Sequence, residues 1–104
     1  MENYNNKLQA IIGLQSKGYD LDFILKDENL LCLQQSELIS PDEFEIAETY
    51  QFKDIQESND TYVIYAIRSV QSDLKGILMT SYGAFNHGLG IHLWCKLSAT
   101  LREY

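Results

Sequence analysis

The feature that most limits how this chain can fold is its longest apolar run, residues 62–67, which Arg68 closes. The run is too short for a helix of ordinary length. It is rich in β-branched and aromatic residues, which favours a β-strand buried on both faces. Such a strand needs a neighbouring strand at each edge and a covering layer on each face. The sequence therefore predicts a sheet around a strand at 61–68.

Two amphipathic helices are predicted, one near each end of the chain. Tyr4, Leu8, Ile11 and Leu14 form one apolar stripe, which predicts a helix at 2–17. Gly18 follows in the position where a left-handed residue ends a helix. A second stripe, with its residues three and four apart, predicts a helix at 91–102. The first helix is expected to pack on one face of the sheet, and the second either joins the first helix or covers part of the other face.

Five strands are expected between these helices, at 22–26, 30–34, 43–53, 61–68 and 74–82. Strands that follow one another through short connections most simply form an antiparallel meander. We therefore predict one α+β domain, 1–104, with the order α-β-β-β-β-β-α. The segment 36–42 is interpreted as a connection. Gly76 lies inside the last strand and predicts a bulge or a close approach of two backbones.

Alternation of apolar residues predicts which side chains share a face in two of these strands. In the first hairpin, with a turn at 27–29, Phe23, Leu25, Leu31 and Leu33 are expected together on one face, opposite Ile24 and Cys32. In the strand at 43–53, one face is expected to hold the apolar residues and to be interrupted by Glu48. These residues are Phe44, Ile46, Tyr50 and Phe52.

The formal net charge of −7 disfavours binding to nucleic acid or to an anionic membrane surface. The N-terminus has no basic segment followed by an apolar one, so no signal peptide is expected. Cys32 and Cys95 lie in apolar segments and are interpreted as buried thiols of a cytoplasmic protein. Cys32 has no histidine nearby in the sequence to act as the base that a nucleophile needs, and either cysteine is interpreted as part of the core.

No complete catalytic or metal-binding motif is present. The glycines at 13 and 18 have the spacing of a P-loop, but the Lys and Ser/Thr that should follow are absent. His92 and Cys95, with His87 nearby, are fewer than the four ligands of a structural zinc site. The carboxylates at 42–48 are interpreted as a solvated face. We therefore expect no catalytic residue, metal or cofactor.

One group of residues is a candidate ligand site. Tyr65, Arg68, Tyr82 and His87 combine aromatic, cationic and titratable side chains near predicted strand ends and the glycine-rich loop at 83–90. Tyrosine and arginine are favoured in interfaces and in ligand clefts. These four residues are the ligand-binding prediction.

Much of 1–85 resembles a family of short bacterial proteins that are often labelled phosphoribosylpyrophosphate synthetase. The resembling segments are Gly18-Tyr19, Asp22-Phe23-Ile24-Leu25, Asp42-Glu43-Phe44-Glu45-Ile46, Val63-Ile64-Tyr65-Ala66-Ile67, Leu74-Lys75-Gly76-Ile77-Leu78 and Tyr82-Gly83. A synthetase of that kind is a much longer chain with ATP, metal and pentose-phosphate sites, and this sequence has no such layout. The resemblance implies a small α+β domain that forms a homodimer, without the labelled activity.

The function predicted from the sequence is that of a non-enzymatic binding or interaction module, in a homodimer and with a further protein partner as an option. A meander has two edge strands that need cover, which motivates the dimer. The alternative is a small-molecule-binding protein or minor enzyme, with its site at the loop 82–90 and the end of the strand at 61–68. The acidic surface also permits a third role, as a decoy that blocks a basic surface.

Overall fold

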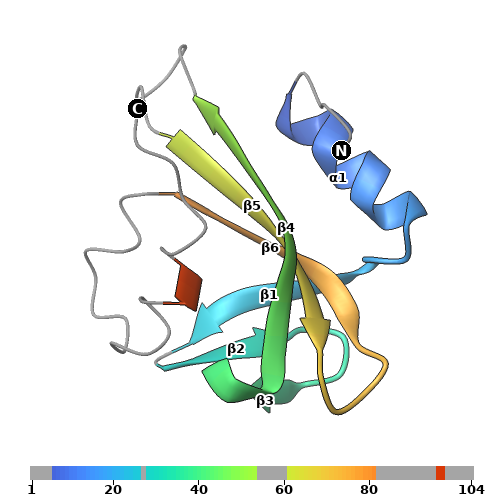
Figure 1. Ribbon diagram of the computed structural model, residues 1–104, viewed down its shortest axis with the longest axis vertical. Coiled ribbons are helices and arrows are strands. Elements are labelled where there is room, and N and C mark those ends of the chain that lie inside the picture. The colour runs from blue at the N-terminus through green and yellow to red at the C-terminus, as the bar shows by residue number, and fades with distance from the viewer. Residues whose placement is uncertain (1–5, 27, 54–60, 82–95, 98–104) are drawn as a thin grey trace.

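A computed structural model describes residues 6–26, 28–53, 61–81 and 96–97 of the 104-residue chain (Figure 1). The α-helix α1, a short 3₁₀ helix and a six-stranded sheet make up most of the described part, so the predicted α+β class is confirmed. The elements are α1 (Lys7–Ser16), β1 (Leu21–Lys26), β2 (Asn29–Cys32), β3 (Glu37–Ile39), the 3₁₀ helix η1 (Pro41–Glu43), β4 (Phe44–Lys53), β5 (Thr61–Ser69) and β6 (Lys75–Ser81).

The sheet is mixed, and the prediction of an antiparallel meander is wrong. Its strand order is β3-β2-β1-β6-β5-β4, in which two antiparallel halves of three strands meet at β1 and β6. These two strands run parallel. Both edges of β5 are already paired, one with β4 and the other with β6. β1 therefore pairs with the edge of β6 that faces away from β5. The predicted five-strand order also lacked β3, which lies inside the segment 36–42 that was interpreted as a connection.

The buried strand predicted from the apolar run is confirmed in β5. All five side chains from Val63 to Ile67 are 0% exposed. They point alternately to the two sides of the sheet, so each side must carry its own cover. Two separate apolar clusters provide it, one on each side.

Helix α1 ends as the sequence predicted, at Gly18. The N–H of Gly18 donates to the carbonyl of Gln15, and the N–H of Tyr19 donates to that of Leu14, which is the pattern of a Schellman motif. Gly18 has the positive φ of 98° that this motif requires. At the other end, the side chain of Asn6 accepts from the N–H of Gln9 and caps the helix.

The helix buries a narrower stripe than predicted. Ala10 and Leu14 are fully buried and Ile11 packs beside them, whereas Leu8 is 63% exposed. Leu8 was expected in the buried stripe, and that prediction is wrong because the sheet contacts the side of α1 centred on Ala10 and Leu14. Tyr4 lies outside the described residues.

The sheet is curled so that its two edges approach each other. Edge strands β3 and β4 are joined by only the short link from Ile39 to Phe44. In a flat sheet of six strands the edges would be about 24 Å apart, since neighbouring strands are separated by about 4.8 Å. Five residues span at most about 18 Å. Curling therefore gives the sheet an inner side and an outer side.

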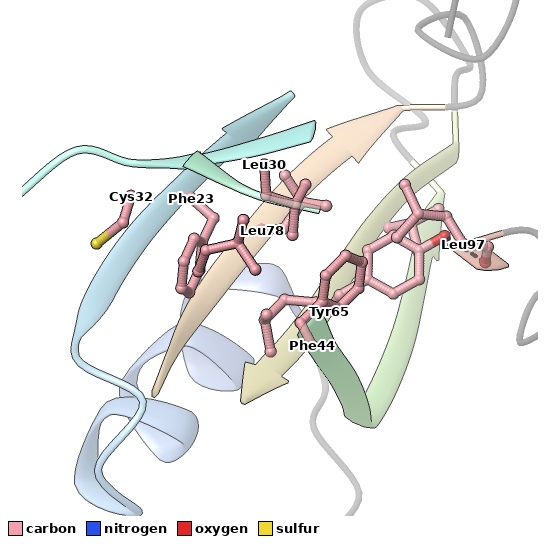
Figure 2. Close-up of a cluster of buried hydrophobic side chains, with 10 residues drawn as sticks. Phe23, Leu30, Cys32, Phe44, Tyr65, Leu78 and Leu97 are labelled. Carbon is pink, nitrogen blue, oxygen red and sulfur yellow. Dashed lines mark hydrogen bonds between the residues drawn. The ribbon is translucent and has the colours of Figure 1, made fainter. Parts of the chain in front are cut away.

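The inner side holds the larger core (Figure 2). It brings Ile39 of β3 and Phe44 of β4 into one cluster with residues of the four strands between them. Its other buried members are Phe23, Leu30, Cys32, Val63, Tyr65, Ile67, Leu78 and Leu97. Leu97 therefore lies on the side of the sheet away from α1. Lys96 and Leu97 are helical, while the rest of the predicted helix at 91–102 lies outside the described residues.

A bulge in β4 changes which side its residues face. The pairing with β5 shifts by one residue between Ile46 and Glu48. Phe44 and Ile46 consequently join the inner core, whereas Tyr50 and Phe52 pack under α1 on the outer side. The prediction that all four share a face is wrong, because one extra residue in a strand reverses the alternation beyond it. Glu48 points to the α1 side, where it pairs with Lys17 at 3.3 Å.

Candidate interaction surface

The turn between β1 and β2 is one residue shorter than predicted, and this decides which leucines are buried. Lys26 lies opposite Asn29, so Leu25 pairs with Leu30 and Phe23 with Cys32. These pairs face the inner core. Leu31 and Leu33 were expected beside Phe23 and Leu25, and that prediction is wrong because a one-residue change of register turns a strand over. Both leucines point to the outer side.

The outer side of β1, β2 and β3 consequently carries a continuous row of apolar side chains. Ile24 lies opposite Leu31, and Leu31 lies opposite Leu38. The parallel pairing of Phe23 with Leu78 places Ile24 next to Met79 of β6. Leu33, which continues the ladder by donating its N–H to Asp22, extends the row on one side. We call the five residues the apolar row: Ile24, Leu31, Leu33, Leu38 and Met79.

Four of these five side chains are open to solvent, and Leu31, between Ile24 and Leu38, is half-buried. Ile24 is 42% exposed, Met79 and Leu33 are each 48% exposed, and Leu38 is 52% exposed. Helix α1 packs over β5 and β6, so the outer side of β1–β3 has no helix of the described residues on it (Figure 1). Single exposed apolar residues are normal, but a contiguous group marks an interaction surface.

Only two charged side chains of β1–β3 share the outer side with the row. Asp22 and Lys26 both belong to β1, two residues before and two residues after Ile24. A carboxylate oxygen of Asp22 accepts from the side-chain amide of Gln34 at 2.8 Å. The side-chain ammonium of Lys26 makes no hydrogen bond or ion pair with the described residues. The surface is therefore apolar, with one negative and one positive group beside its centre.

The sequence of β2 and β3 indicates an apolar outer side, although the expected alternation of faces did not predict it. Residues 30–33, Leu-Leu-Cys-Leu, are apolar at every position, and Leu38-Ile39 follows shortly after. A strand apolar on both faces requires cover on both faces. In β2 and β3, the inner core provides one cover and no described element provides the other.

The four residues of the predicted ligand site are not brought together as far as the structure describes them. Tyr65 is fully buried on the inner side and donates its hydroxyl hydrogen to the carbonyl oxygen of Leu97 at 2.9 Å (Figure 2). Arg68, three residues later, points to the outer side. Tyr82 and His87 lie outside the described residues.

Arg68 instead takes part in a group of ion pairs and ring contacts near the C-terminal end of α1. Its guanidinium binds the carboxylate of Glu45 at 2.5 Å, and this hydrogen bond raises the pKa of Arg68. Beside it, the Lys75 ammonium lies 4.4 Å from the centre of the Tyr19 ring and donates to the carbonyl oxygen of Lys17. Each of these cations has a partner within the fold, so the group ties α1 to the sheet.

A further contact closes the inner core near η1. The Lys96 ammonium donates to the carbonyl oxygens of Pro41 and Phe44 and lies 4.5 Å from the centre of the Phe44 ring. In η1, the N–H and the hydroxyl of Ser40 donate to the Glu43 carboxylate at 3.1 and 2.8 Å. Both hydrogen bonds favour the charged form and lower the pKa of Glu43.

Two further observations limit the chemistry of the described residues. They contain no group of three or more His, Cys, Asp or Glu side chains able to hold a metal ion. None of their helices is long and apolar enough to cross a membrane.

The chain matches no protein-family model, and no curated protein or solved structure matches it significantly. The resemblance to the short bacterial family therefore stays a prediction.

Proposed function

We propose that the protein is a small, non-enzymatic interaction module of the cytoplasm that binds protein through the apolar row. The observation that carries this proposal is the outer side of β1–β3 and the neighbouring Met79 of β6, which no helix of the described residues covers. Ile24, Leu33, Leu38 and Met79 are each between 42% and 52% exposed there. Moving a contiguous group of apolar side chains out of water lowers the free energy, so this surface favours binding to another apolar surface. The buried free thiol of Cys32 supports the cytoplasmic location.

The alternative, a small-molecule site, has less support. It depended on Tyr65 and Arg68 acting together, and they lie on opposite sides of the sheet, with Tyr65 fully buried. Arg68, Lys75 and Lys17 are already engaged by Glu45, by Tyr19 and by Glu48. A row of leucine, isoleucine and methionine suits another apolar surface better than a polar metabolite.

The proposal is tested by a photoreactive amino acid placed at Leu38 in the protein expressed in its own cells. We expect irradiation to give one or a few discrete protein adducts, because a used interface holds a defined partner. The matched control is the same amino acid at Val70, which is 50% exposed but lies outside the row. Adducts at both positions alike, or at neither, would refute the proposal.

A further inference from the structure

We infer that the apolar row binds a second copy of the same chain, stacked about a two-fold axis so that Asp22 of each copy faces Lys26 of the other. This inference rests on the proposed function and names the partner.

The charges that the strands β1–β3 carry on the outer side are balanced, in contrast to the chain as a whole. The whole sequence carries a formal net charge of −7. The charged side chains of β1–β3 on the outer side are Asp22 and Lys26, which cancel. Two copies of an acidic protein repel each other over most of their surfaces. The least repulsion between them arises where the local charge is zero and the surface is apolar.

The two charges are also arranged symmetrically. Asp22 and Lys26 lie two residues on either side of Ile24 on one strand, and all three side chains point to the outer side. When the two β1 strands stack antiparallel, with Ile24 over Ile24, each Asp22 meets a Lys26 of the partner subunit. When they stack parallel, like charges meet. The charges therefore select the antiparallel arrangement.

This arrangement makes the interface isologous, meaning that the same patch is used by both copies. The row crosses the strands from Met79 through Ile24 and Leu31 to Leu38. A two-fold axis along the row brings Ile24 and Leu31, at its middle, against their counterparts, with Leu38 and Met79 on either side of them. Helix α1 contacts β5 and β6, whereas the row lies mainly on β1–β3, so among the described residues α1 leaves the row open to a second copy.

The same features fit other partners less well. A basic peptide would be drawn to acidic surface, whereas the row has one Lys beside its one Asp. The net charge of the chain opposes every acidic partner, a second copy included, so such a partner has to bring a Lys and an Asp that match Asp22 and Lys26. A second copy covers the apolar row and at the same time offers a Lys to Asp22 and an Asp to Lys26.

The size of the apolar row determines how tightly two copies are expected to bind each other. A stable protein interface buries about 800 Å² on each partner. The row contributes five side chains that are already half covered, so its apolar area is smaller than that. We therefore expect a dimer with a dissociation constant in the micromolar range, which dissociates on dilution.

Sedimentation equilibrium over a range of micromolar concentrations tests the inference. We expect a monomer–dimer equilibrium for the wild type, and a dissociation constant at least about tenfold higher for Leu38→Asn and for Ile24→Asn. Val70→Asn, which removes an exposed apolar side chain outside the row, is the matched control and should dimerise like the wild type. Circular dichroism and urea unfolding show whether each variant is folded.

A charge exchange tests the arrangement of the two copies. Asp22→Lys and Lys26→Asp each create two like-charge contacts across the axis, so each variant alone should dimerise at least about tenfold more weakly. The double variant D22K/K26D restores both attractive pairs and should recover the dimer. An equimolar mixture of the two single variants should form heterodimers, which native mass spectrometry distinguishes by mass.

Several results would overturn the inference. They are a monomer at all these concentrations, a dimer unaffected by the Leu38 and Ile24 substitutions, and a double variant no tighter than the single ones. If the photoreactive amino acid at Leu38 captures a different protein while the purified chain stays monomeric, the inference fails and the proposed function holds. If nothing is captured at Leu38, the proposed function fails as well.

Discussion

Gly76 of β6 lies directly opposite Leu21 of β1, at the start of the parallel pair that joins the two halves of the sheet. A Cβ atom on Gly76 would lie 2.8 Å from the carbonyl carbon of Leu21 and 2.7 Å from the ring of Phe23. These are backbone and packed ring atoms, which cannot move aside without disturbing the pairing. The close approach predicted for this glycine is thus confirmed, and its position explains why β1 can pair with β6.

We expect Gly76→Ala to lower the free energy of unfolding by about 1–3 kcal/mol, the usual cost of overpacking. Urea denaturation followed by circular dichroism measures this. Gly13→Ala is the control, because Gly13 lies inside α1 without a positive φ, and alanine there should raise stability by about 0.5–1 kcal/mol. Equal effects at the two positions would contradict the close approach.

Gly18 is the second glycine whose conformation matters. Its φ of 98° is unfavourable for any side chain. We expect Gly18→Ala to cost about 1–2 kcal/mol, since a Cβ in a left-handed conformation meets the following carbonyl oxygen. Gly18→Asn should cost less, because asparagine tolerates this region better. Thermal unfolding of the two variants side by side provides the measurement, and an alanine variant as stable as the asparagine one would argue against the Schellman ending.

Tyr65 anchors the residue Leu97 through a hydrogen bond that is fully buried. We expect Tyr65→Phe to lower stability by about 1 kcal/mol, because the hydroxyl donates to the Leu97 carbonyl oxygen where water does not replace it. Tyr19→Phe is the control: its hydroxyl makes no hydrogen bond with the described residues, while its ring keeps the contact with Lys75. Urea unfolding should show a clear loss for the first variant only. Similar losses for both would mean that the Tyr65 hydrogen bond is not the cause.

The sequence was sufficient to predict elements whose signals are local. The apolar run at 62–67 identified β5, and Lys17-Gly18 identified the end of α1. The alternation within a strand was also read correctly over short stretches. The α+β class followed from these elements, since strands fill the middle of the chain and a helix precedes them.

What the sequence did not reveal are single-residue changes of register. The turn after Lys26 moved Leu31 and Leu33 to the outer side, and the bulge at Ala47 moved Tyr50 and Phe52 to the opposite side from Phe44. Periodicity cannot mark such positions, because the pattern on either side of them is unchanged. The apolar row was missed for this reason. The pairing of β1 with β6 was missed because it depends on contacts between distant parts of the chain.

Glu43 should make stability depend on acid pH. Hydrogen bonds from the N–H and the hydroxyl of Ser40 hold the pKa of Glu43 below its ordinary value of 4.5 in the folded protein. Because the unfolded state then binds more protons, this contribution is fully present above pH 4.5 and is lost as the pH falls through the folded pKa. Glu43→Gln keeps an acceptor for Ser40 but does not titrate.

We therefore expect the wild type to be more stable than Glu43→Gln at neutral pH, and the difference to shrink as the pH falls below 4.5. The other carboxylates are common to both proteins, so their titration cancels in the difference. Asp42→Asn, a change at the exposed neighbour in η1, is the control and should give a difference that stays small throughout. Urea unfolding of the three proteins at neutral and acid pH measures it. A Glu43→Gln difference that stays the same at every pH would show that the Ser40 hydrogen bonds do not favour the charged carboxylate.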